Sequence, residues 1–152
     1  MTQDLQLWLA NGWVHSHVTS RQEIEHLFGI VDNVRLDLDA EVTNDTRFQV
    51  AYRGILALCT VMVAISGYRV GRDLHHYRSI AAIPLVLGSE YAMTAKFLEQ
   101  CRKKRNELAY TLSGVATDTD VHDLIATFRE LETTVRAWAV RTAPEMLEGL
   151  SE

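Results

Sequence analysis

Apolar residues recur along most of this chain at three- and four-residue spacing, which is the period of an α-helix with one buried face. This pattern predicts five main helices, over residues 20–38, 43–66, 74–87, 90–110 and 120–141. Shorter helices are predicted after Asp4 and from Pro144. No segment alternates apolar and polar residues for long enough to predict a β-strand. We therefore expect an all-α fold, an antiparallel up-and-down helical bundle of five or six helices, forming one domain over residues 1–152.

Local signals place several of the helix ends. Ser20 and Glu23 have the Ser-x-x-Glu spacing of a capping box, in which side chains bond to the free backbone N–H groups of the first turn. Gly67 is expected to end the helix that precedes it, because glycine readily adopts the left-handed conformation found after helices. Pro84 lacks a backbone N–H donor, so we expect a kink or a break in the helix that contains it.

The longest apolar run covers residues 54–67 and contains no charged side chain. It is shorter than the roughly 20 residues that a helix needs to span a bilayer, so it predicts a buried central helix and no membrane partner. Residues 1–4 carry no basic region before an apolar stretch, and Cys59 and Cys101 form no CxxC motif. We therefore expect no secretory signal, a cytoplasmic location, and two reduced cysteines that pack in the core.

Charge is distributed unevenly along the 152 residues, although the net charge is only −5. Residues 47–105 hold 10 lysines and arginines against 3 acidic residues, which gives +7. The flanking segments 1–46 and 106–152 each carry −6. Two interpretations are open: a local site for a polyanion, or internal complementarity between a basic centre and acidic outer helices.

The densest positive charge lies in the predicted helix 90–110. Four cationic residues stand in a row, Arg102, Lys103, Lys104 and Arg105. Asn106 follows, and helical spacing places Arg102, Asn106 and Tyr110 on one face with Arg105 beside them. Guanidinium groups match the geometry of phosphate oxygens. The stretch predicts a site for an RNA or nucleotide phosphate, and its alternative is a solvated basic helix face.

Three segments occur in an order that is typical of one protein family. They are the apolar helix ending in residues 67–69 (Gly-Tyr-Arg), the helix start at 74–76 (Leu-His-His) with residues 80–88 after it, and the basic stretch 102–110. In this order, which covers about half of the chain, they resemble the HEPN superfamily of small helical-bundle proteins. The resemblance implies a helical bundle that acts as a homodimer, with a cleft between the subunits.

The basic stretch carries the most specific part of this resemblance. HEPN ribonucleases have an Arg, a polar residue that is often Asn, three further residues and a His. Arg105 and Asn106 match the first two positions, whereas Tyr110 stands in place of the His. The resemblance implies that Arg105 holds a phosphate and stabilises its developing charge, with Asn106 orienting it. Tyrosine, with an ordinary pKa near 10, is a poor base at neutral pH, although it can donate a hydrogen bond or act as an acid.

Further residues extend or replace parts of this site. His75 and His76 are the candidates to supply the missing imidazole, but they point about 100° apart on a helix, so at most one faces the cleft. The alternative for both is helix capping or ordinary surface. The residues that extend the phosphate track are Arg53, Arg69 and Arg72, with Tyr68 stacking on a base. Their alternatives are ion pairs with the acidic helices and packing at the bundle edge.

No metal or other cofactor is expected. His15 and His17 have the spacing of two ligands, but no cysteine or carboxylate beside them completes a site.

Three functions are compatible with these observations. The sequence favours a HEPN-like module that binds RNA or nucleotide phosphate through its Arg-Asn-x-x-x-Tyr site without efficient cleavage. The second is a metal-independent HEPN endoribonuclease of the toxin type, which uses Arg105 with Tyr110 or a nearby His. The third is a protein–protein interaction bundle. The family also implies a partner, either a cognate antitoxin or a nucleotidyltransferase-like protein.

Overall fold

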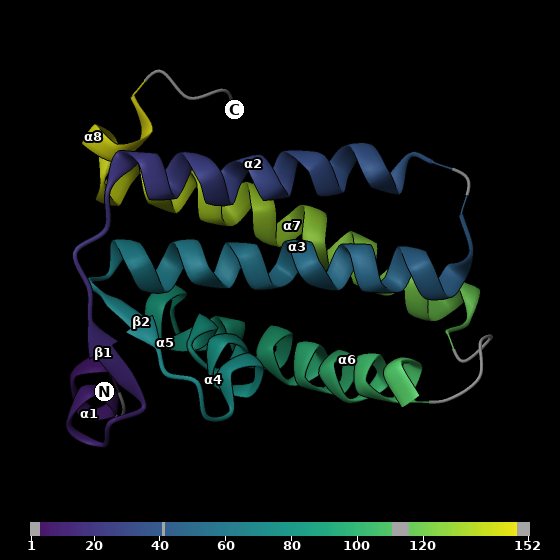
Figure 1. Cartoon of the computed structure of the whole chain (residues 1–152), viewed down its shortest axis with the longest axis horizontal. Helices are drawn as coiled ribbons and strands as arrows, with labels where there is room; N and C mark the ends of the chain where they lie inside the picture. The colour runs from purple at the N-terminus through teal and green to yellow at the C-terminus, as the bar shows by residue number, and fades with distance from the viewer. Residues whose placement is uncertain (1–3, 41, 111–115, 149–152) are drawn as a thin grey trace.

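The computed structural model describes residues 4–40, 42–110 and 116–148, and it confirms the all-α prediction (Figure 1). The long helices are α2 (Arg21–Leu38), α3 (Asn44–Ile65), α6 (Ala92–Tyr110) and α7 (Asp118–Thr142). The short ones are α1 (Leu5–Ala10), α4 (His75–Ala81), α5 (Ile83–Leu87), the 3₁₀ turn η1 (Ser89–Tyr91) and α8 (Pro144–Leu147). Two strands, β1 (Val14–Ser16) and β2 (Tyr68–Val70), complete the elements in the described ranges.

Side-chain caps begin three of the four long helices, α2, α3 and α7, and the cap of α2 is the one that the sequence indicates. The Ser20 hydroxyl accepts a hydrogen bond from the backbone N–H of Glu23 at 3.1 Å. The expected reciprocal bond is replaced, because the Glu23 carboxylate accepts from Thr19 and pairs with His17 at 2.8 Å. A full capping box forms instead at α7, where Thr117 and Asp120 bond to each other's backbone N–H groups. Capping of this kind satisfies donors that the helix itself leaves free.

The main core forms around α3, which lies between α2 and α7 on one side and α4 and α6 on the other (Figure 1). Its fully buried side chains include Phe48, Tyr52, Ile55, Leu58 and Met62. Among the described helices, α3 alone is long and apolar enough to cross a membrane, but 67% of its most apolar 18-residue window is buried by the other elements. This burial makes α3 the core helix that the apolar run predicts.

Both cysteines are buried free thiols, in agreement with their expected packing role. Burial raises the pKa of the Cys59 thiol to about 12 and that of the Cys101 thiol to the same value. Because the thiolate is the reactive form, neither sulfur is a nucleophile at neutral pH.

The prediction that no segment forms a strand is wrong. β1 and β2 form an antiparallel ribbon in which His15 lies opposite Arg69 and Val14 lies opposite Val70. Three-residue strands are too short for an alternating pattern, and the pairing joins segments more than 50 positions apart. The ribbon fixes α1 to the end of α3 through a second apolar cluster that contains Trp8 and Val63.

The segment around Pro84 breaks into two helices, as its missing N–H predicts. α4 ends at Ala81, and Pro84 lies in the first turn of α5, where a backbone N–H would have no helical partner. α4 begins after Leu74, whose φ of 53° is the one positive φ of a non-glycine residue in the described chain. The break allows α4 to pack against both α3 and α6.

Candidate functional site

The four cations of α6 point in different directions. Lys104 reaches α7 and pairs with Asp120 at 3.5 Å, while Lys103 is exposed. Arg102 is bound by the carboxylate of Glu99 through two hydrogen bonds of 2.7 and 2.6 Å, and its guanidinium lies 5.7 Å from the Tyr77 ring centroid of α4. The hydrogen bonds from Arg102 lower the pKa of Glu99, so both partners stay charged at neutral pH.

Arg105 faces a cavity between α3, α4 and α6. Its guanidinium lies 5.8 Å from the centroid of the Tyr52 ring. The cavity has a volume of about 480 Å³, and its polar lining comes from Thr46, Gln49, Tyr52, Arg53, His76 and Arg105. We call it the Arg105 cavity. Among the described residues, no carboxylate lies within ion-pair distance of Arg105, in contrast with Arg102 and Lys104.

An imidazole and a phenol meet in this cavity. The Tyr52 hydroxyl oxygen lies 3.4 Å from Nδ1 of His76, and the ring centroids are 5.8 Å apart. Burial, together with the positive charges of Arg105 and Arg102, lowers the pKa of His76, so its imidazole is neutral at pH 7. Burial also raises the pKa of Tyr52, which keeps its hydroxyl protonated. The pair therefore offers neutral hydrogen-bonding groups beside a permanent cation.

Only one of the two adjacent histidines reaches the Arg105 cavity, in agreement with their helical separation. His76 lines it, whereas His75 is exposed and contacts His76 ring to ring at a centroid distance of 5.8 Å. Asn106 is half-buried on α6. Tyr110 is the last residue of α6, and its side chain lies outside the described part of the structure.

The other residues predicted to contact phosphate or a base do not form one continuous surface. Arg53 lines the Arg105 cavity, but it also pairs with Asp37 of α2 at 3.2 Å. Arg69 and Arg72 line a different cavity, beside the β-ribbon. Tyr68 packs against the second apolar cluster. Residues 76 and 78 of α4 lie about 200° apart around the helix axis, so the two cavities flank opposite sides of α4.

Apart from Arg53, the sequence interpretation missed the contribution of α3. Tyr52 is buried in the core, but its hydroxyl reaches the Arg105 cavity, and Thr46 and Gln49 line the same cavity from earlier turns. A buried phenol normally needs a polar partner, and that requirement is the signal in the sequence that points to a site beside Tyr52.

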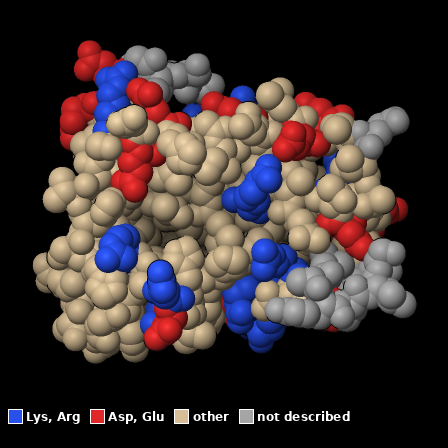
Figure 2. All heavy atoms as spheres, in the orientation of Figure 1, with Lys and Arg blue, Asp and Glu red and all other residues tan. Residues whose placement is uncertain are grey.

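The surface charge is consistent with both interpretations of the uneven charge distribution, a polyanion site and pairing between the basic centre and the acidic helices. Figure 2 shows lysines and arginines gathered over α6 and the middle of α3, and acidic side chains gathered along α2 and near α8. Arg53–Asp37 and Lys104–Asp120 are pairs between the basic centre and the acidic helices. The complementarity is incomplete, because Arg105 has no such partner in the described ranges.

Compared with protein-family models, with curated proteins and with solved structures, the chain matches none. Within the described residues, no three metal-ligating side chains gather at one place.

Proposed function

We propose that this chain is a HEPN-like helical module that binds a phosphate group of RNA or of a nucleotide in the Arg105 cavity. The observation that carries the proposal is the state of Arg105 itself. Its guanidinium is placed over Tyr52 at the edge of a cavity, and no carboxylate in the described residues compensates its charge. A half-buried guanidinium in this state gains two charge-assisted hydrogen bonds when a phosphate binds.

The neighbours of Arg105 suit a phosphate ester. Thr46 supplies a hydroxyl and Gln49 an amide at the cavity wall, and His76 supplies a neutral ring nitrogen. Arg53 adds a second guanidinium, part of whose charge is taken up by Asp37. These groups donate hydrogen bonds to phosphate oxygens and to a ribose hydroxyl, and they require no metal.

A metal-independent endoribonuclease is the second candidate, and the position of His76 favours it. His76 shares the cavity with Arg105 and is neutral at pH 7, so it can accept a proton where Tyr110 cannot. In such a reaction His76 takes the proton of the ribose 2′-hydroxyl, whose oxygen attacks phosphorus as the bond to the 5′-oxygen breaks. Arg105 stabilises the charge on the phosphate, and the motif assigns the protonation of the leaving oxygen to Tyr110.

The HEPN resemblance extends the proposal to assembly and location. We infer a cytoplasmic homodimer that pairs with a cognate antitoxin or a nucleotidyltransferase-like protein. A cleft shared by two subunits would bring two copies of α6 together, which would double the positive charge that faces an RNA strand.

The test is the binding and cleavage of a fluorescent oligouridylate in the presence of a metal chelator. Arg105→Gln is expected to weaken binding about tenfold or more, because the neutral amide of glutamine cannot replace both charge-assisted hydrogen bonds of the guanidinium. It should also reduce the slope of log affinity against log salt by about 0.7, the value for one phosphate contact of a single strand. Lys103→Gln is the matched control, because Lys103 lies on the same helix, is exposed, and does not line the cavity.

The same assay separates the two candidates. Cleavage that is lost in both Arg105→Gln and His76→Gln would identify an endoribonuclease. Tyr110→Phe then tests whether Tyr110 is the general acid that protonates the leaving oxygen. Binding without cleavage identifies the binding module. If Arg105→Gln binds as tightly as the wild type, the proposal is wrong, and the basic stretch is a solvated helix face on a protein–protein interaction bundle.

A further inference from the structure

A second basic cavity lies beside the β-ribbon, on the other side of α4 from the Arg105 cavity. It has a volume of about 860 Å³, within the range of sites that bind small ligands. Its aromatic and charged lining residues are Trp13, His15, Arg69, Arg72, Asp73 and Arg78. We call it the ribbon pocket. None of these residues lines the Arg105 cavity.

Positive charge exceeds negative charge in the ribbon pocket, where three arginines face one carboxylate. In the described parts of the chain, no carboxylate lies within ion-pair distance of Arg69, Arg72 or Arg78, although Asp73 lines the same cavity. Several other arginines are held by carboxylates, as Arg102 is by Glu99. Three guanidinium groups in one concave surface repel one another and raise the local potential, and a bound anion removes that cost.

Arg78 is held in place before any ligand binds. Its guanidinium carbon lies 4.6 Å from the centroid of the Trp13 ring, a cation–π contact. Its Nη1 donates a hydrogen bond to the backbone carbonyl of Asp73 at 3.3 Å. These contacts fix the plane of the guanidinium and leave its other N–H donors available, so little side-chain freedom is lost when an anion binds.

The backbone places the other groups around the pocket. His15 and Arg69 lie directly opposite each other in the ribbon, so their side chains extend from the same face. Gly71 continues the pairing by donating its N–H to the Trp13 carbonyl at 3.0 Å, and a Cβ at this position would lie 3.4 Å from Nε2 of His15. Leu74 closes the turn with a φ of 53°, a conformation that is costly for a side chain of its size.

We propose that the ribbon pocket is a second anion site that binds a phosphate group through Arg69, Arg72 and Arg78. A phosphate has more oxygens than a carboxylate. Several guanidinium groups arranged around a cavity can therefore each donate hydrogen bonds to one phosphate. The phosphate belongs either to a free phosphorylated small molecule or to an RNA strand that crosses α4. The site stands on its own residues, so it does not depend on the function proposed for Arg105.

The test follows the indole N–H signal of Trp13 by NMR while inorganic pyrophosphate is added at low salt. A saturable shift of the Trp13 signal is expected, with no shift for Trp138, which packs against the main core. Trp13→Phe assigns the signal. Arg69→Gln and Arg72→Gln each replace an exposed side chain and leave the fold intact, which circular dichroism checks. Each is expected to weaken pyrophosphate binding about tenfold.

Two controls keep this site separate from the Arg105 cavity. Arg141→Gln removes an exposed arginine of α7 that does not line the pocket and should leave the titration unchanged. Arg105→Gln should also leave it unchanged, even if it abolishes RNA binding. The proposal is overturned if the Trp13 signal does not saturate, or if Arg72→Gln and Arg141→Gln weaken binding equally.

An oligouridylate without a 5′-phosphate then distinguishes the two sources of phosphate. If it displaces pyrophosphate and moves the Trp13 signal, the pocket holds the backbone of an RNA strand. If pyrophosphate saturates the pocket and the oligouridylate leaves the signal in place, the pocket serves a free phosphorylated molecule.

Discussion

Among single residues, His76 combines contact with Tyr52 and proximity to Arg105 in one cavity. Because of this position, the pKa of the His76 imidazole differs between the folded and the unfolded chain. Burial and neighbouring positive charge lower the pKa of His76, so the unfolded chain binds this proton at a higher pH than the folded chain does. Stability and proton uptake are therefore linked at this residue.

We predict that His76 makes the protein less stable as the pH falls through the ordinary histidine pKa of about 6.5. The folded pKa is lowered, so the stability that the neutral ring contributes is present above that value. It is lost as the pH falls toward the lower folded pKa. Urea unfolding at pH 7 and pH 5 measures this, and His76→Gln should show a smaller decrease in the free energy of unfolding than the wild type.

A matched variant controls for the general effect of acid. His26→Gln removes an exposed histidine on α2 that lines neither cavity, so its decrease should equal that of the wild type. Equal decreases for His76→Gln and the wild type would show that His76 ionises as readily in the folded chain as in the unfolded chain.

Packing between elements depends on a glycine where three helices meet. A Cβ at Gly54 of α3 would lie 3.0 Å from Val34 of α2 and closer still to the Phe128 ring of α7. Both neighbours are buried side chains with little room to move. The absence of a side chain at Gly54 therefore sets how closely α2 and α7 approach the central helix.

We predict that Gly54→Ala destabilises the protein by about 1–2 kcal/mol. Overpacking destabilises by about 1–3 kcal/mol, and the better helix propensity of alanine offsets at most about 1 kcal/mol of that loss. Gly29→Ala is the control within α2, because no atom lies within 4 Å of its Cβ position. It should stabilise the protein by about 0.5–1 kcal/mol, and chemical denaturation compares the two. A stabilising Gly54→Ala would contradict the close approach of the three helices.

The same elements mark how far the sequence could predict the structure. The long helices follow from spacing within each segment, and the break at Pro84 follows from one missing donor. The β-ribbon has no local signal, because His15 and Arg69 pair only once the end of α3 turns back along the N-terminal segment. Arg105 and His76 were both named from sequence. Their meeting over Tyr52, and the separation of Arg69 and Arg72 into another cavity, depend on how α4 packs.

At the scale of the whole molecule, the acidic and basic segments of the chain form different helices of the bundle. The two acidic segments supply α2 and α7, which both pack against α3 and are joined by ion pairs, and the basic segment supplies α4 and most of α3 and α6 (Figure 1). Packing two acidic helices together requires cations between them. Arg35 and Arg136 provide these, although they are two of only five arginines and lysines in both acidic segments.

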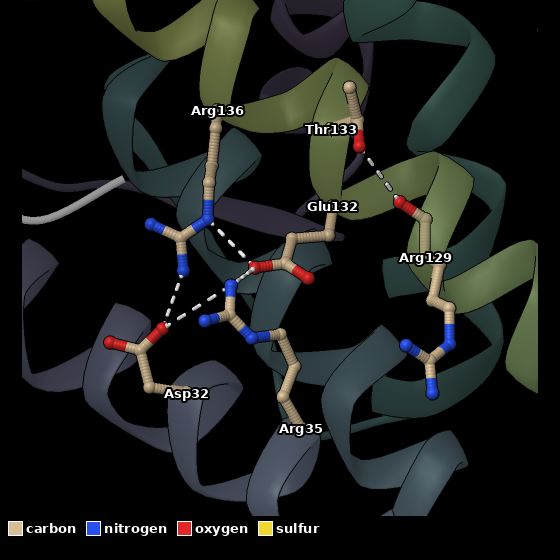
Figure 3. Close-up of polar contacts among 6 residues, drawn as sticks. All are labelled: Asp32, Arg35, Arg129, Glu132, Thr133 and Arg136. Carbon is tan, nitrogen blue, oxygen red and sulfur yellow. Dashed lines mark hydrogen bonds and ion pairs between the residues drawn. The ribbon is translucent and has the colours of Figure 1, made fainter.

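The resulting network centres on Glu132, whose side chain is only 8% exposed (Figure 3). Its Oε2 accepts hydrogen bonds at 2.8 Å from Arg35 of α2 and from Arg136 of α7. Arg136 also donates to Asp32 at 2.8 Å. Arg129 lies outside the network: its guanidinium points away from Glu132, and only its backbone carbonyl accepts a bond from Thr133 (Figure 3).

We predict that Glu132→Gln destabilises the protein by about 2–3 kcal/mol, because two guanidinium groups lose their shared buried anion while Asp32 compensates only part of their charge. Arg129→Gln, on the same helix but outside the network, should change the free energy of unfolding by less than about 0.5 kcal/mol. Urea denaturation measures both. Since α2 and α7 come from opposite ends of the chain, an equally small effect of Glu132→Gln would mean that apolar packing alone joins the two acidic helices.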